Sequence, residues 1–292
     1  MDKRQLLIIV VLIAAFAAFA AVMLISGAAA SKEKEEQVIT ADDGASMTVT
    51  GLKCGSADAY IIVKDGHAAV IDCGESDDGG KVVSALKLRG IDTVDIMIIS
   101  HFDQDHVGGA AEVIRECDVK EVYVTYLSKD SDEIDDFSAA CEAKGLTPVV
   151  ISEDTVLTLP GASMTVYPPQ KDDYGSDTSN NSSLAVMLED EATGKRMFFT
   201  GDAENKRIKE LTVLGDIACD VLKVPHHGRW ESRFPELVAA CSPQYAVINS
   251  SDTNPEDKDT LDALEQSGVS VYLTRSGTVT FEFFEDRIDV KQ

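Results

Sequence analysis

The segment of residues 101–109 constrains this chain more than any other feature of its sequence. It reads His-Phe-Asp-Gln-Asp-His-Val-Gly-Gly and lies between Asp95–Ser100, an apolar run typical of a buried strand, and Ala110–Cys117, which has helical spacing. Its metal-binding side chains are His101, Asp103, Asp105 and His106. Without a cation, burying these carboxylates and imidazoles together is unfavourable because of repulsion and lost hydration. Since polar groups at strand ends form the sites of α/β folds, the segment predicts a divalent metal site.

Two later segments follow the same plan, in which an apolar strand ends at a potential metal ligand. In Phe198–Asp202 the strand ends with Gly-Asp, and in Leu222–Gly228 it leads into Pro-His-His-Gly. Taken alone, Asp202 could equally cap the helix that follows it, and an adjacent pair such as His226 and His227 is more often structural. Together with the first segment, however, these strand ends indicate one shared site.

The order of the expected elements favours two packed β-sheets with helices outside, rather than one doubly wound sheet. Short strands open the chain at Met47–Leu52, Tyr60–Lys64 and His67–Asp72, and the Lys-Asp-Gly sequence between the last two is a hairpin signal. Strands and helices alternate after this hairpin. The polar stretch Pro168–Ser183 predicts no secondary structure, and loops of this length are usually functional or disordered.

The N-terminus is a separate segment. Leu6–Ile25 is an unbroken apolar run of 20 residues that follows two basic residues, and this length suffices for one membrane-spanning helix. A retained anchor is the favoured interpretation, and the alternative is a signal peptide with a cleavage site at Ala28–Ala30. Either one places the remainder outside the cytoplasmic membrane, tethered or secreted. The expected organisation is a signal anchor or signal peptide at 1–30, a charged linker at 31–45 and a folded domain at 46–289.

The charge balance excludes one broad class of partner. The chain has 26 Lys and Arg against 51 Asp and Glu, a formal net charge of −25. A broad basic face for nucleic acid is therefore not expected, and neither is a stable nucleic-acid complex. A metal site could still act on nucleic acid, because a bound cation reverses the local charge. The six cysteines include no Cys-x-x-Cys pair, which disfavours a zinc ribbon.

The three ligand-bearing segments, His101–Gly109, Phe198–Asp202 and Pro225–Gly228, resemble the motifs of the metallo-β-lactamase superfamily. Within it, the chain is similar to the extracytoplasmic hydrolase domain of ComEC competence proteins and its stand-alone relatives. Four further stretches carry the same resemblance: Ala57–Ile61, Val70–Gly74, Asn180–Leu184 and Ser276–Val279. The resemblance covers about residues 46–285. It implies an α+β fold, the αββα sandwich, with a metal site at one edge.

The resemblance implies a centre of two divalent ions, zinc or manganese. His101 and Asp103 would bind the first ion. Asp103 stands where most of the superfamily has histidine, and a carboxylate there favours a harder ion such as manganese or magnesium. A further histidine that usually completes this site is missing, so the first site is expected to be weak. Asp72 would orient the first loop from behind, and Asn181 and Ser182 would support the ligands from the polar loop.

The same resemblance assigns the second ion to Asp105, His106 and His226, with Asp202 bridging both ions. In the alignment with the family motif, the spacing between the histidine and the following glycine favours His226 over His227 as the ligand. His227 would then protonate the leaving group or assist the ligands from behind. Asp105 and His227 are accordingly the expected catalytic residues.

These features predict metal-dependent hydrolysis, with a phosphodiester as the favoured substrate. Cations that activate water and stabilise charge on phosphoryl oxygens suit this reaction. The resemblance favours DNA outside the cell, whereas the negative net charge repels a polyanion and keeps a small phosphodiester as an alternative. Lactonase, lactamase or thioesterase chemistry is a further alternative, which Asp103 disfavours. The last alternative is a degenerate, membrane-tethered sensor domain that binds metal without turnover.

Overall fold

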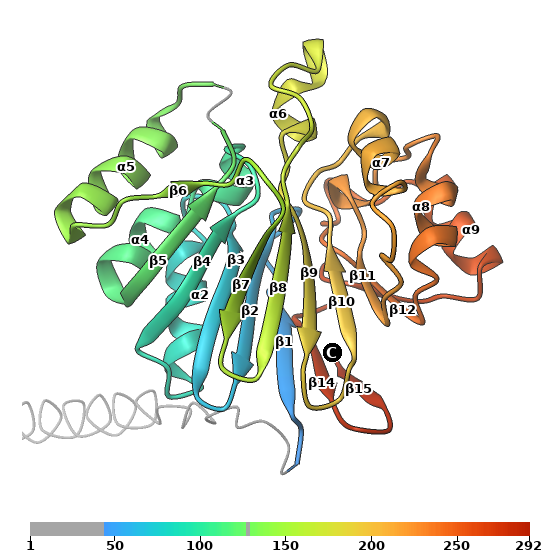
Figure 1. Cartoon of the computed structure of the whole chain (residues 1–292), viewed down its shortest axis with the longest axis horizontal. Coiled ribbons are helices and arrows are strands. Elements are labelled where there is room, and N and C mark those ends of the chain that lie inside the picture. The colour runs from blue at the N-terminus through green and yellow to red at the C-terminus, as the bar shows by residue number, and fades with distance from the viewer. Residues whose placement is uncertain (1–43, 127–128) are drawn as a thin grey trace, which may run out of the picture. The chain divides into compact units, whose positions relative to one another are not determined.

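Two β-sheets pack face to face in the domain that the computed structural model describes, residues 44–126 and 129–292 (Figure 1). Helices cover the outer face of each sheet. The expectation of a two-sheet sandwich of mixed helix and strand is confirmed. No helix within the described residues is long and apolar enough to cross a membrane. The expected N-terminal segment at 1–30, including Leu6–Ile25, lies outside the described residues.

The first sheet has eight strands in the order β15-β14-β1-β2-β3-β4-β5-β6. They are β1 (Met47–Gly51), β2 (Ala59–Lys64), β3 (His67–Cys73), β4 (Thr93–Ile99), β5 (Asp118–Val124), β6 (Val149–Val150), β14 (Val279–Phe283) and β15 (Ile288–Lys291). Strands β3 to β6 are parallel. Asp65 and Gly66 turn between β2 and β3 with positive φ angles of 50° and 81°, as a two-residue hairpin of this hand requires. The expected hairpin is therefore present.

The second sheet has seven strands in the order β13-β12-β11-β10-β9-β8-β7. They are β7 (Thr155–Leu159), β8 (Ala162–Tyr167), β9 (Ala185–Asp190), β10 (Arg196–Phe199), β11 (Val221–Lys223), β12 (Tyr245–Ile248) and β13 (Ser270–Leu273). Strands β10 to β13 are parallel, and β7 to β10 are antiparallel. The edge strands β6, β7 and β15 were not expected from the sequence, because runs of two to five residues are too short to show a period.

The helices lie mainly between parallel strands. They are α2 (Gly79–Lys87), α3 (Gln104–Val107), α4 (Ala110–Glu116), α5 (Asp132–Lys144), α6 (Thr178–Asn181), α7 (Asn205–Leu211), α8 (Phe234–Cys241) and α9 (Lys258–Gln266), with 3₁₀ turns η1 (Gly175–Asp177) and η2 (His226–Gly228). The presence of η1 and α6 contradicts the expectation that Pro168–Ser183 has no secondary structure. Local bonds stabilise these turns: the Thr178 hydroxyl accepts from the Tyr174 amide at 2.8 Å and donates to the Gly175 carbonyl at 2.8 Å. Such short polar turns have no apolar periodicity to reveal them.

Alternating side chains divide the strands between separate apolar cores. Ile98 belongs to the core between the sheets, whereas Ile99 packs against the helices outside the first sheet. Phe199 faces the inner core and Phe198 the helices outside the second sheet. Successive residues of a strand point to opposite faces, so each strand contributes to two layers. This packing fixes the direction in which each strand end presents its side chains.

The segment after β4 connects the two sheets at the edge where the ligand-bearing loops begin. The amide of Leu184, just before β9, donates to the carbonyl of Ser100 at 2.9 Å. Nearby, the rings of Tyr60 and Phe199 pack edge to face with centroids 5.1 Å apart. Strands β4, β10 and β11 end at this connected edge, so the loops that follow them can share one site.

We expect Gly109→Ala to destabilise the domain by about 3 kcal/mol, because a well-packed backbone cannot move aside. A Cβ atom there would lie 2.2 Å from the carbonyl oxygen of Cys73 and 2.7 Å from the amide nitrogen of Gly79. Urea unfolding followed by circular dichroism measures the change. Gly80→Ala is the matched control, since its Cβ would lie 3.2 Å from Glu112 Oε1, the mobile end of a side chain. Equal midpoints for the two variants would contradict the expected close packing behind the first loop.

Candidate metal centre

Four side chains from three strand ends converge: Asp105, His106, Asp202 and His227. His106 Nε2 lies 3.3 Å from Asp202 Oδ1. His227 Nε2 lies 2.9 Å from Asp202 Oδ2 and 3.0 Å from Asp105 Oδ2. One potential ligand atom of each residue lies within 4.8 Å of the others. The first segment supplies Asp105 and His106 from α3, while the loops after β10 and β11 supply the other two.

The ring nitrogens of this cluster are placed to bind a cation and not to form hydrogen bonds with the nearby carboxylates. His106 Nε2 and His227 Nε2 are buried and form no hydrogen bond, although carboxylate oxygens lie close by. The same holds for His101 Nε2, which lies 3.6 Å from Asp103 Oδ2. Buried polar atoms normally have a partner, and nitrogen and oxygen atoms that approach without bonding can share an ion. The donor set suits zinc, manganese or iron.

Asp72 holds the first loop from behind. Its carboxylate accepts hydrogen bonds from the Ser100 amide and hydroxyl, both at 2.7 Å, and from His106 Nδ1 at 2.8 Å. Asp72 itself has a positive φ of 57°, which aspartate tolerates better than most residues. With Nδ1 held in this way, His106 presents Nε2 toward Asp202, an arrangement typical of histidines that bind metals.

His101 and Asp103 lie beside the four-residue cluster. The rings of His101 and His106 are 4.1 Å apart between centroids. Asp103 accepts hydrogen bonds from Lys129 Nζ and Ser179 Oγ. Burial alone would raise the pKa of Asp103, but His101, Lys129 and Ser179 hold that pKa far below its ordinary value. Asp103 is therefore an anionic group whose charge an ammonium already partly balances.

The two adjacent histidines face different surroundings, and this differs from the expectation for His226. Both have positive φ angles, 48° for His226 and 53° for His227, so this strained turn separates their side chains. His227 points into the four-residue cluster, whereas His226 Nδ1 lies 3.8 Å from Glu204 and 3.7 Å from Glu231. The expected second-ion ligand thus lies in a separate group, and His227 occupies the position expected for it.

Asn181 and Ser182 turn away from the cluster. Asn181 donates to the Asp177 carbonyl at 2.8 Å and to Glu204 at 3.0 Å, and Ser182 Oγ donates to the Ser179 carbonyl at 2.6 Å. Their expected contact with the ligands is therefore not found. The cause is the helical turn α6, which directs Ser179 and Ser183 inward instead. Ser183 Oγ accepts from the Asp202 amide at 2.9 Å and lies 3.4 Å from His101 Nδ1.

Asp58 and Lys223 were not among the site residues expected from the sequence, yet both are buried behind the cluster. Lys223 Nζ forms an ion pair with Asp58 and lies 3.5 Å from Asp202 Oδ1. It also donates to the Gly201 carbonyl at 2.9 Å. Asp58 Oδ1 lies 3.5 Å from His227 Nδ1. The available signal was a lysine inside the apolar strand Val-Leu-Lys-Val, because a buried lysine requires a carboxylate partner.

The charges in the cluster stabilise one another. Burial opposes ionisation of Asp202, but His227, His106 and Lys223 hold its pKa well below the ordinary value. Burial likewise opposes ionisation of Asp105, and His106 and His227 lower its pKa to about 2. Burial would lower the pKa of both histidines, but Asp202 above all raises it well above the ordinary value. Protons therefore occupy the imidazoles when no metal is bound, and metal must displace them.

The sandwich and its histidine–aspartate loops define a domain of the metallo-β-lactamase type. The family model described as the metallo-beta-lactamase superfamily matches residues 52–248. The chain belongs to this superfamily, as its motifs predicted.

Two curated relatives support the narrower resemblance to competence proteins. ComE operon protein 3 of Bacillus subtilis (strain 168) is 30% identical over 214 residues, which are 70% of this chain and 27% of that protein. Recombination protein 2 of Haemophilus influenzae (strain ATCC 51907 / DSM 11121 / KW20 / Rd) is 30% identical over 261 residues, 84% of this chain and 30% of that protein. The chain thus spans less than a third of the length of either relative.

The metallo-β-lactamase fold protein YhfI from Bacillus subtilis has a similar structure. Its TM-score is 0.57 at 13% sequence identity, and the match covers 84% of this chain and 99% of YhfI. This likeness shows the shared fold alone.

We expect added Mn²⁺ or Zn²⁺ to raise the melting temperature more at about pH 8.5 than at about pH 6.5, by about 3 °C or more. The raised pKa values of His106 and His227 stabilise the metal-free fold at low pH, and this contribution is lost as the pH rises through those values. Protons also compete less with the metal for the nitrogens of His106 and His227 as the pH rises. Differential scanning fluorimetry with and without chelator measures both effects, and a shift independent of pH would contradict them.

The different placement of the two histidines predicts different metal affinities for His227→Asn and His226→Asn. Asparagine tolerates the positive φ of both positions, so each variant keeps the turn. We expect His227→Asn to weaken the tighter Mn²⁺ or Zn²⁺ site by about 100-fold or more, and His226→Asn to change it by less than about threefold. Isothermal titration of metal into chelator-treated protein gives these constants. The reverse order would restore His226 as the ligand.

Proposed function

We propose that this chain is a metal-dependent phosphodiesterase whose centre holds two divalent cations, zinc or manganese. The observation that carries the proposal is the convergence of Asp105, His106, Asp202 and His227 with unpartnered ring nitrogens. Asp103 supports phosphodiester chemistry over lactam or thioester hydrolysis, because those enzymes generally carry histidine at its position.

The ligands divide between the two ions as follows. His101 and Asp103 would hold the first ion, and Asp202 would bridge the pair. Asp105, His106 and His227 would hold the second ion, with His227 replacing His226 in the earlier assignment. Apart from Asp202, the first ion would have only two ligand residues, and one of them, Asp103, already accepts hydrogen bonds from Lys129 and Ser179. Both facts support weaker binding at the first site.

When bound, the two cations supply Lewis acidity and a water molecule acidic enough to attack at neutral pH. The hydrolysis adds water across one P–O bond, so the oxygen of water joins phosphorus and the alcohol leaves with a proton. Asp72 fixes the ring of His106 through Nδ1, and Asp58 faces Nδ1 of His227. These contacts keep both Nε2 atoms aimed at the reacting region. His227 lies between Asp58 and the other residues of the cluster, so we propose that it binds metal and does not donate the proton.

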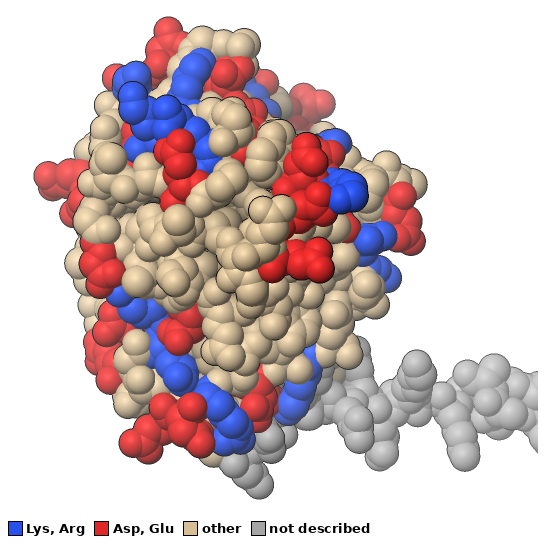
Figure 2. Space-filling model, turned by 90° about the vertical axis from the view of Figure 1, so that its right-hand side faces the viewer, with Lys and Arg blue, Asp and Glu red and all other residues tan. Residues whose placement is uncertain are grey.

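The proposed substrate class is a phosphodiester, either DNA or a small molecule. On the face shown in Figure 2, Lys and Arg alternate with Asp and Glu around a broad neutral area, and no continuous basic band crosses that face. This mixed charge supports brief contact with substrate and not a stable nucleic-acid complex. The proposed location is outside the cytoplasmic membrane, supported by the apolar run Leu6–Ile25.

Substrate screening tests the reaction class. Residues 38–292 with Mn²⁺ or Zn²⁺ should hydrolyse bis-p-nitrophenyl phosphate and leave the lactam nitrocefin intact. Asp202→Ala should lower turnover by more than about 1,000-fold and reduce metal content with it, because it removes the bridging carboxylate. Metal content is measured by plasma mass spectrometry on the same sample.

Asp172→Ala is the control for this variant, because Asp172 is exposed in the polar loop. It should keep both metal and turnover. Full activity of Asp202→Ala would refute the bridging assignment. Metal binding without turnover of any phosphodiester would instead favour a sensing domain.

A further inference from the structure

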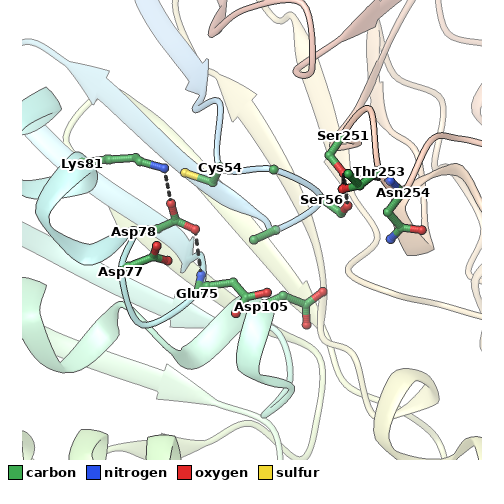
Figure 3. A pocket seen from close by; sticks show the side chains of 12 residues that line it. Cys54, Ser56, Glu75, Asp77, Asp78, Lys81, Asp105, Ser251, Thr253 and Asn254 are labelled. Carbon is green, nitrogen blue, oxygen red and sulfur yellow. Dashed lines mark hydrogen bonds and ion pairs between the residues drawn. The ribbon is translucent and has the colours of Figure 1, made fainter.

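A cavity of about 570 Å³ opens beside Asp105 of the candidate metal centre (Figure 3). Its walls come from residues 54–57 before β2, residues 75–78 between β3 and α2, Lys81 of α2, and residues 251–254 after β12. Because Asp105 lines it, a phosphate held at the centre would direct one of its ester groups into this space. The residues of the walls therefore select that group.

One wall of the cavity is acidic. Asp78 is satisfied, since it accepts hydrogen bonds from Lys81 Nζ at 2.5 Å and from the Glu75 amide at 3.0 Å. Asp77 forms no hydrogen bond or ion pair within the described residues, and Glu75 accepts one bond from the neutral side chain of Gln104 at 3.1 Å. Lys81 is the sole Lys or Arg among the described lining residues. Two carboxylates thus face the cavity without a cation.

Other carboxylates lie near Glu75. Burial, together with the nearby charges of Asp105, Asp78 and Asp77, raises the pKa of Glu75 above its ordinary value. A positively charged group in the cavity would relieve this repulsion. A further phosphate there would increase it.

The opposite wall is neutral and polar. Ser56 Oγ lies 3.1 Å from Ser251 Oγ, and Ser251 Oγ in turn lies 3.2 Å from Thr253 Oγ1 and accepts from the Asn254 amide at 3.0 Å. None of the described lining residues is aromatic. Nucleobases usually stack on aromatic rings, and quaternary ammonium groups are usually caged by them. This wall therefore suits neither a nucleobase nor a quaternary ammonium group. Its hydroxyl oxygens can instead accept hydrogen bonds from a small donor group.

We propose that this cavity binds a primary ammonium carried on one ester arm of the substrate, so that the enzyme acts on small aminoalkyl phosphodiesters in preference to DNA. The inference rests on the proposed phosphodiesterase activity. An ammonium has three donors and a full positive charge, which match two free carboxylate groups and a wall of hydroxyls. A DNA strand would instead place its next phosphate against Glu75 and Asp77.

Two matched chromogenic probes test this assignment: 2-aminoethyl 4-nitrophenyl phosphate and propyl 4-nitrophenyl phosphate. They differ in an ammonium against a methyl group of similar size. Hydrolysis of each adds water to phosphorus, breaks the P–O bond to 4-nitrophenol, and leaves the phosphomonoester. We expect kcat/KM to be about tenfold higher for the amine, as one charged hydrogen-bonded contact provides.

The double variant Glu75→Gln, Asp77→Asn removes both free carboxylates and keeps their shapes. It should bring the ratio of the two kcat/KM values close to one, because the ammonium then has no carboxylate partner in the cavity. Glu285→Gln, Asp286→Asn removes two charges from the β14–β15 hairpin and serves as the control for net charge. It should keep the original ratio.

The outcomes separate this inference from the proposed function. Equal kcat/KM values for the two probes, a ratio that survives in the double variant, or faster cleavage of single-stranded DNA than of the amine probe would overturn the inference and leave the phosphodiesterase standing. If neither probe is hydrolysed, the proposed function fails. In that case, titration of Mn²⁺-loaded protein with O-phosphoethanolamine tests the ammonium site by itself. About tenfold weaker binding by the double variant supports the site, and equal binding overturns it.

Discussion

The rest of this structure depends on the burial of carboxylates around three histidines at one edge of the sandwich. Asp58, Asp72 and Asp202 are almost completely buried, and Lys223 is the lysine that contacts two of them. A single ammonium cannot balance three buried anions, so further positive charge is required. Protons on the imidazoles supply it in the metal-free protein, and divalent cations suit the same positions.

The two sheets make this concentration of charge possible. Apolar side chains fill the space between the sheets and outside them, so the polar groups are confined to the strand ends. The parallel strands β4, β10 and β11 deliver their loops to one edge, and Gly109 allows the first loop to pack against β3. The same edge carries the acidic cavity. The proposed centre would attract one phosphate while Glu75 and Asp77 repel the next, which is a means of selecting a small substrate.

Much of the site could be predicted because its ligands follow strands whose apolar character is local. The two-sheet sandwich and the ligand-bearing segments were accessible in this way, and the superfamily was accessible because these segments resemble known motifs. The choice between His226 and His227 was not, because it depends on the positive φ angles of a two-residue turn. Asn181 and Ser182 were misplaced for a similar reason, since the α6 turn determines which side chains of the polar loop face inward. Asp58 lies in Ala57–Ile61, a stretch that carries the family resemblance, but its place in the site is revealed only by its buried partner Lys223.

The sequence by itself determined the family, most of the strands and helices, and the types of group available to bind a metal. The family follows from the resemblance of the motifs, and the rest follows from apolar periodicity and from the chemistry of residues near one another in the chain. Only the tertiary structure decided which imidazole joins Asp202, which carboxylates support the histidines, and which acids line the cavity beside Asp105. Those outcomes depend on backbone angles of single residues and on contacts between distant segments, for which no local pattern exists.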